Sequence, residues 1–113
     1  MGCLFCKIVG REIPSQIVFE NEHALAFKDL RPAAPSHALV IPKKHIAGIR
    51  DATPEDAATL GHVMLAARQV AEDLGLGETG YRIVINQGAN AGQSVFHLHV
   101  HVLGGRGMSW PPG

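Results

Sequence analysis

The sequence predicts a single α+β domain with a mainly antiparallel five-stranded sheet, one long helix and a short N-terminal helix. Its 113 residues suffice for one modest hydrophobic core. About five strand-like segments share the chain with one long helical segment, whereas a parallel α/β fold would alternate strands and helices throughout. No internal repeat or linker divides the chain, so we expect one domain over residues 1–113, with residues 104–113 as a C-terminal tail.

The first third of the chain predicts a short helix and three strands. The segment CLFCKIVGREIP begins as a helix that ends at Gly10. Three strand-like segments follow: IVFE (17–20), ALAFKD (24–29) and HALVIP (37–42). Pro32 and Pro35 make the loop LRPAAPS rigid and non-helical.

The long helix has clear start and stop signals. Thr53 is suited to be its N-cap, Pro54 its first residue, and Glu55 and Asp56 the acids of its first turn. Gly75 ends it. Apolar residues recur at helical spacing between these signals: Leu60, Val63, Met64, Ala67, Val70, Ala71 and Leu74. The segment YRIVIN (81–86), the glycine-containing loop GANAGQS and a last strand complete the domain.

The last strand-like segment, VFHLHVHVLGG (95–105), carries three histidines at alternating positions. Residues two apart on a strand share a face, so His97, His99 and His101 form one row. Leu98, Val100 and Val102 then point into the core. A single histidine on a strand is usually a structural residue, but three in register favour a functional site.

Three kinds of chemistry compete for this row. Two histidines two residues apart on a strand can share a zinc ion. Three in a row rarely bind one ion, because the outer pair lies roughly 13 Å apart along the backbone. Imidazoles can also bind an anion without catalysis, or one of them can act as a nucleophile. The preceding loop favours anion handling, because glycines such as Gly88 and Gly92 let backbone N–H groups approach phosphate, and Gln93 and Ser94 add polar side chains.

Composition excludes several partners. Ten basic residues balance ten acidic ones, so no overall charge predicts binding to nucleic acid or to a membrane surface. No apolar run reaches the roughly 20 residues of a membrane span. The N-terminus lacks a secretory pattern, and the two cysteines cannot form a disulfide framework, so we expect a cytoplasmic protein.

The segment HLHVHVL resembles the signature of the histidine triad (HIT) family. The resemblance extends to the HINT branch of purine nucleoside phosphoramidases over nearly the whole chain, through FCKIVGREIPS, FKDLRPAAPSHALVIPKKHI, YRIVINQG, GQSVFHLHVHVLGG and WPPG. It implies a HIT-like homodimer, with the sheet extended across the dimer. It also implies hydrolysis of nucleoside phosphoramidates, such as adenosine 5′-phosphoramidate, through a nucleotidyl-histidine. The alternatives are hydrolysis of dinucleoside polyphosphates, or nucleotide binding without catalysis.

The resemblance also assigns roles to individual residues. It implies that His99 is the nucleophile, and that His101, His37 and Ser94 complete the catalytic set. The implied substrate-binding residues are Phe5, Ile8, Phe27, Asp29, Leu30, Asn86, Gly92, Gln93, Ser94, His99 and His101. A tail like that around Trp110 packs near the active site across the dimer in similar proteins.

Cys3 and Cys6 have the C-x₂-C spacing of a zinc site. Many bacterial HIT proteins have such a pair, and the resemblance implies that His45 and His97 complete a Cys₂His₂ set for structural zinc. Two reduced thiols in a short helix are the alternative. The chemistry itself requires no metal, because an imidazole nucleophile replaces a metal-bound water.

Overall fold

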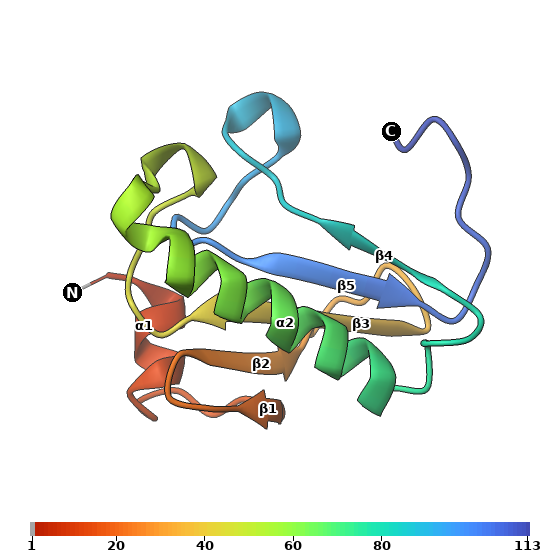
Figure 1. Ribbon diagram of the computed structural model, residues 1–113, viewed down its shortest axis with the longest axis horizontal. Helices are drawn as coiled ribbons and strands as arrows, with labels where there is room; N and C mark the ends of the chain where they lie inside the picture. Colours follow the sequence, from red (N-terminus) through yellow and green to blue (C-terminus); the bar gives the residue numbers. More distant parts are fainter. Residues whose placement is uncertain (1) are drawn as a thin grey trace.

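The structure, a computed structural model that describes residues 2–113, has the predicted α+β architecture (Figure 1). Its main elements are α1 (Leu4–Val9), β1 (Ile17–Glu20), β2 (Ala24–Lys28), β3 (Ser36–Pro42), α2 (Ala57–Asp73), β4 (Tyr81–Val84) and β5 (Val100–Gly104). Three short 3₁₀ helices lie in the connections: η1 (Ile49–Asp51), η2 (Pro54–Asp56) and η3 (Ala89–Ala91). The prediction of the fold class is therefore confirmed.

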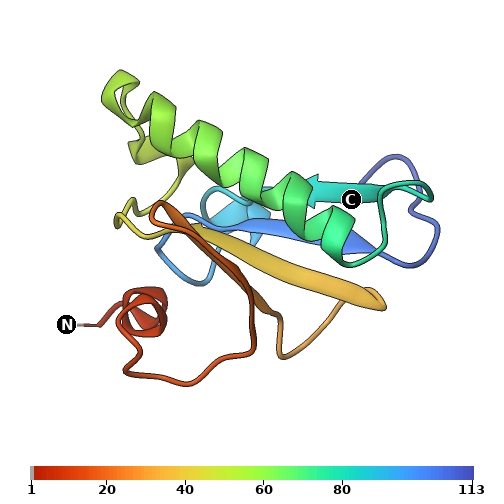
Figure 2. The same ribbon diagram turned by 60° about the horizontal axis from the view of Figure 1, so that its bottom comes forward.

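The five strands form one sheet in the order β1-β2-β3-β5-β4, and every neighbouring pair is antiparallel. The two helices lie on opposite faces of this sheet, α2 on one side and α1 on the other (Figure 2). Alternation along β2 supplies both cores: Ala24 and Ala26 pack in the cluster that includes α2, whereas Leu25 and Phe27 pack with Phe5 of α1.

The helical segment begins at the predicted Pro54, but its first three residues form the 3₁₀ helix η2, and α2 itself begins at Ala57. Thr53 and Asp56 form a capping box at the start of η2, which leads directly into α2. At the other end Gly75 has φ +77°, a left-handed conformation that glycine adopts without strain. Met64, which shares the helical spacing of the apolar residues, is 43% exposed. Ala66 is buried instead, in a stripe of Val63, Ala66, Ala67, Val70 and Ala71.

The last strand is shorter than predicted. β5 begins only at Val100, so of the three histidines only His101 lies within a strand. The ladder between β3 and β5 ends at the pair Val40–Val100, two residues before Pro42, which has no N–H to donate. Beyond that pair, the N–H of Leu98 donates to the carbonyl of Ile46 at 2.6 Å.

The division of sides along this segment nevertheless holds. Val100 and Val102 are buried against α2, as predicted for the apolar row. The ring of Phe5 in α1, on the opposite face, contacts both His97 and His99, with centroid distances of 6.0 and 5.2 Å. The histidines therefore lie on the α1 side of the sheet, where the candidate site is.

Within the described residues no helix is long and apolar enough to cross a membrane.

Candidate active site and metal centre

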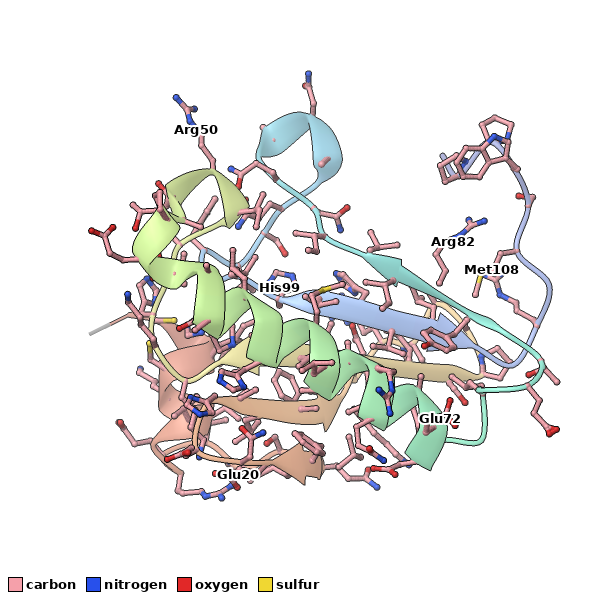
Figure 3. All side chains as sticks on the ribbon, in the orientation of Figure 1. Glu20, Arg50, Glu72, Arg82, His99 and Met108 are labelled. Carbon is pink, nitrogen blue, oxygen red and sulfur yellow. The ribbon has the colours of Figure 1, made fainter. Side chains whose placement is uncertain are left out.

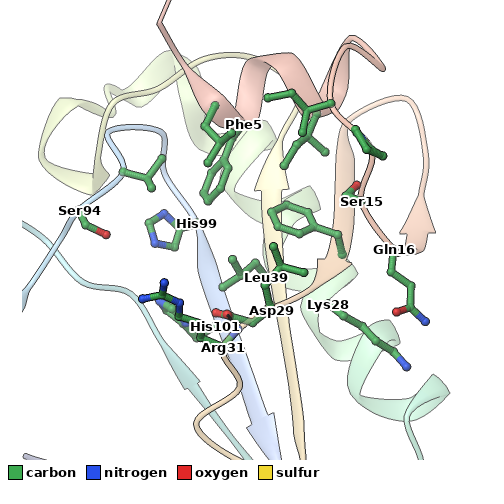
Figure 4. Close-up of a pocket in the computed structure, with 17 residues that line it drawn as sticks. Phe5, Ser15, Gln16, Lys28, Asp29, Arg31, Leu39, Ser94, His99 and His101 are labelled. Carbon is green, nitrogen blue, oxygen red and sulfur yellow. Dashed lines mark hydrogen bonds between the residues drawn. The ribbon is translucent and has the colours of Figure 1, made fainter.

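A cavity of about 510 Å³ opens between α1, β2, the loop after β2 and the histidine segment (Figure 4). This volume lies within the range of small-molecule sites. Its apolar wall combines Phe5, Ile8, Phe27 and Leu39, all buried. The rings of Phe5 and Phe27 meet edge to face, 5.3 Å apart at 71°. Such a slot suits a flat, largely apolar group.

Most residues predicted to bind substrate line this cavity. The set comprises Phe5, Ile8, Phe27, Asp29, Leu30, Ser94, His99 and His101. Leu30 lies at the edge of the cavity, with 94% of its surface exposed. Three other predicted residues, Asn86, Gly92 and Gln93, are not among the described residues that line it.

Gln93 instead fixes the loop that precedes the histidine segment. Its side-chain amide donates to the carbonyls of Ala47 at 3.0 Å and Val95 at 3.3 Å, and its Oε1 accepts the N–H of Gly88 at 2.9 Å. Gly92 adopts φ +81° in the same loop. In this structure the Gln93 side chain contacts backbone groups, and Ser94, the next residue, lies at the edge of the cavity.

The hydrogen bond of His99 determines which of its ring nitrogens is free. Nδ1 lies 2.8 Å from the carbonyl oxygen of His97, and a carbonyl only accepts, so Nδ1 carries the hydrogen. In the neutral imidazole, Nε2 then keeps its lone pair. His99 lines the cavity and is 9% exposed, and Phe5 packs edge-on against its ring at 89°. The structure therefore holds an imidazole with its Nδ1–H fixed beside the apolar slot.

His37 and His101 form a second polarised pair. Nδ1 of His37 accepts the N–H of Ala33 at 2.9 Å, so its Nε2 carries the hydrogen. That N–H points to Nδ1 of His101 at 2.9 Å, while Asp29 Oδ2 lies 3.4 Å from Nε2 of His37. His101 accepts at Nδ1 and therefore carries its own hydrogen on Nε2. The chain Ala33–His37–His101 thus orients an N–H donor on a side chain that lines the cavity.

Burial keeps these imidazoles neutral. Burial, with the neighbouring His99 and His37 rings, lowers the pKa of His101 to about 4. Burial likewise lowers the pKa of His37, although the Asp29 carboxylate opposes this shift. At neutral pH both rings are therefore uncharged hydrogen-bonding groups.

A second cluster of side chains has the composition and the spacing of a metal centre. Cys3, Cys6, His45 and His97 offer ligand atoms that all lie within 4.8 Å of one another. Nδ1 of His97 is 3.3 Å from Cys3 Sγ, 3.5 Å from Cys6 Sγ and 3.1 Å from His45 Nδ1, and Cys6 Sγ is 3.3 Å from His45 Nδ1. Bond lengths typical of zinc in a tetrahedral site give N–N and N–S separations of about 3.3–3.6 Å. The four predicted ligands could hold a metal ion such as zinc.

The tautomer of His97 fits this role. Its Nε2 lies 2.8 Å from the carbonyl oxygen of Pro42, to which it donates, so Nδ1 presents a lone pair to the cysteines. His97 is fully buried. Its carbonyl oxygen accepts from His99, so one residue joins the metal centre to the imidazole beside the slot.

The cavity also contains polar residues that the sequence did not indicate. Lys28, Arg31 and Gln16 line it together with Ser15, whose buried hydroxyl has no partner among the described residues. In Figure 4, Gln16, Lys28 and Ser15 lie at one end, whereas Arg31 lies at the end that holds His99 and His101. Charged residues in loops are usually solvated, so only the fold could show that Arg31 reaches this site.

Comparison with known proteins agrees with this geometry. Residues 10–108 match the HIT domain. The chain belongs to the HIT family. It is 58% identical to a HIT-like protein of Synechocystis over 97% of this chain and 96% of that protein. A HIT family hydrolase from Legionella pneumophila superposes with a TM-score of 0.96 at 52% identity, over 99% of this chain and 100% of that one. A histidine triad nucleotide-binding protein from Candida albicans has a TM-score of 0.83 at 34% identity, over 97% and 83%.

Proposed function

We propose that this HIT protein is a nucleotide-binding hydrolase that cleaves P–N bonds of nucleoside 5′-phosphoramidates, with His99 as the nucleophile. The observation that carries the proposal is the bond from His99 Nδ1–H to the His97 carbonyl. It leaves the Nε2 lone pair on a side chain that lines a cavity with an apolar slot. The names of similar structures, a hydrolase and a nucleotide-binding protein, support the same class of activity.

The cavity offers a complementary group for each part of a nucleoside monophosphate. A purine is flat and apolar on its faces, which suits the slot between Phe5, Ile8 and Phe27. Asp29 lies beside the slot and its carboxylate can accept hydrogen bonds from ribose hydroxyls. The phosphate then reaches the end of the cavity that holds His99 and His101.

The reaction proceeds as two displacements at phosphorus. Nε2 of His99 attacks the α-phosphorus, the P–N bond of the substrate breaks, and its electron pair leaves on the amine nitrogen, which takes up a proton. Ser94 lies at the cavity edge, where its hydroxyl can donate toward that nitrogen. Water then attacks the phosphorus and loses a proton to solvent, and the bond to His99 breaks with its electron pair returning to Nε2, which releases the nucleoside monophosphate. The Nε2–H of His101 stabilises negative charge on the phosphoryl oxygens in both steps.

We assign the Cys3–Cys6–His45–His97 centre a structural role with zinc as its metal. When bound, zinc would link α1 to the segments that carry His45 and His97, and it supplies no group to the reaction. Burial and the hydrogen bond with Cys3 raise the pKa of the Cys6 thiol, so metal binding must displace a proton there. None of the four ligands is the proposed nucleophile.

We further propose that the protein is a homodimer whose sheet continues across the interface. Among the described residues β4 pairs only with β5, so its other edge is open to a second copy. Large apolar side chains are exposed elsewhere on the chain, among them Phe96 at 62%, Leu65 at 62% and Trp110 at 81%. A second copy would cover part of this surface.

A substrate comparison tests the proposed activity. Purified protein is assayed with adenosine 5′-phosphoramidate, a diadenosine polyphosphate and a sugar nucleotide, and with the His99→Ala variant as control. We expect the phosphoramidate to have the highest kcat/KM, and His99→Ala to abolish its turnover while nucleotide binding persists. Preference for the diadenosine polyphosphate would identify a dinucleoside polyphosphate hydrolase instead. Nucleotide binding without turnover of any of the three would make the protein a binding module.

A further inference from the structure

We infer that Arg31 selects substrates whose leaving group carries a negative charge, such as an amine that bears a carboxylate. This inference rests on the proposed function and adds the class of leaving group. Arg31 lines the cavity together with Ser94, His99 and His101, at the end away from Lys28 and Gln16 (Figure 4).

The guanidinium of Arg31 is available for a ligand. Arg31 is exposed. The five ion pairs among the described residues involve other basic side chains, namely Arg11, His23, His37, Lys43 and Lys44. Only the backbone N–H of Arg31 takes part in a hydrogen bond within the described chain, to Asp29 Oδ1 at 2.8 Å. By contrast, the side chain of Arg50 on η1 lies at the surface and extends away from the fold (Figure 3).

The backbone that carries this guanidinium is fixed with respect to the site. The bond to Asp29 closes a local turn, and Asp29 itself lines the cavity. Pro32 follows, and a residue before proline is confined to extended conformations. Little backbone freedom is therefore lost when Arg31 binds a ligand, and only its side chain must be ordered.

The charges of the cavity indicate what Arg31 binds. In the proposed complex the nucleoside occupies the apolar slot, and the transferred phosphate already has a neutral N–H donor in His101. The Asp29 carboxylate accepts the backbone N–H of Arg31 through Oδ1, and its Oδ2 lies beside His37. It therefore forms no ion pair with the Arg31 guanidinium, whose charge stays available for a ligand. The leaving group must extend toward the open edge, where Arg31 is exposed. A carboxylate or phosphate on that group could accept both parallel N–H donors of a guanidinium.

A pair of substrates that differ by one charge tests the inference. The two compounds are adenosine 5′-phosphoramidates in which the nitrogen belongs to glycine or to glycinamide. We expect Arg31→Ala to lower kcat/KM about tenfold for the glycine compound and less than about twofold for the glycinamide compound. Arg31→Lys should retain part of the preference for the glycine compound, because lysine keeps the positive charge but lacks the paired N–H donors of the guanidinium.

Lys28→Ala is the matched control, because it removes one positive charge from the other end of the same cavity. It should leave the ratio of the two kcat/KM values unchanged. An equal loss for both compounds in Arg31→Ala would place Arg31 on the transferred phosphate, and no loss for either would remove it from the site; both results overturn the inference.

A binding measurement separates this inference from the proposed function. The same two compounds are titrated into His99→Ala protein, with and without Arg31→Ala, by calorimetry. Tighter binding of the glycine compound that disappears in the double variant supports the role of Arg31, even if wild type hydrolyses neither compound. Equal affinity of the two compounds for His99→Ala protein contradicts it.

Discussion

Loss of the metal centre should destabilise the fold more than it slows the reaction, and Cys6→Ser is the perturbation that tests this. Cys6 lies 39 residues before His45, and Cys3 lies 94 residues before His97. Treating the metal as a cross-link that closes a 39-residue loop gives a stabilisation of about 4 kcal/mol from chain entropy alone. For a chain of this length, 3–4 kcal/mol corresponds to a fall in Tm of about 13–17 °C.

The assay combines metal analysis with thermal unfolding. Wild type should contain about one zinc per chain. Cys6→Ser should lose the zinc and show the fall in Tm given above. Below both transition temperatures kcat should fall by no more than about tenfold, because His97 only positions His99 through its carbonyl oxygen. Lys7→Ser on the same helix is the control, and it should keep both the metal and the Tm. Metal-free wild type with an unchanged Tm would refute the reasoning.

Three further predictions concern pH, the leaving group and assembly. Burial lowers the pKa values of His37 and His101, so the unfolded state binds more protons than the folded one between about pH 4 and pH 6.5, and stability should fall as pH drops through this window. After allowance for the half-buried position of His101 the loss should be about 1–2 kcal/mol by denaturant titration, and a stability that rises on acidification would contradict the burial argument. Ser94→Ala should slow release of amines more than of good leaving groups such as fluoride or p-nitrophenolate; equal slowing would remove Ser94 from the departing group. Sedimentation at micromolar concentration should show a dimer, and deletion of residues 110–113 should alter substrate preference more than Tm; a monomer would refute the proposed interface.

The fold class was predictable because its signals are local. The capping residues Thr53 and Asp56, the apolar spacing along α2 and the alternation in β2 and β3 each depend on a few neighbouring residues. The start of β5 was not predictable from local signals. It depends on where β3, its partner strand, stops pairing with it near Pro42. A pattern of alternating histidines carries no information about that limit.

The sequence indicated many residues of the candidate site, but not the hydrogen bonds between them. The triad and the C-x₂-C pair follow from motifs in the chain, whereas the slot residues follow from the family resemblance. The fold brings the cysteine pair together with His45 and His97, and it lines one cavity with the slot residues, His99 and His101. The hydrogens on His97, His99 and His101 depend on the carbonyls of Pro42 and His97 and on His37, which tertiary structure alone brings into contact. The same holds for Gln93, whose amide is taken by backbone groups, and for Arg31, which no motif distinguishes from a solvated loop residue.

The central claim is that His99 forms a covalent bond to the substrate phosphorus, and rapid quenching tests it most directly. Wild type is mixed with excess adenosine 5′-phosphoramidate, quenched within one turnover, digested and analysed by mass spectrometry under conditions that preserve phosphohistidine. We expect a mass increase of one adenosine monophosphate on the peptide that contains His99, absent from His99→Ala. Turnover without any such adduct, or a near-normal rate in His99→Ala, would contradict the account.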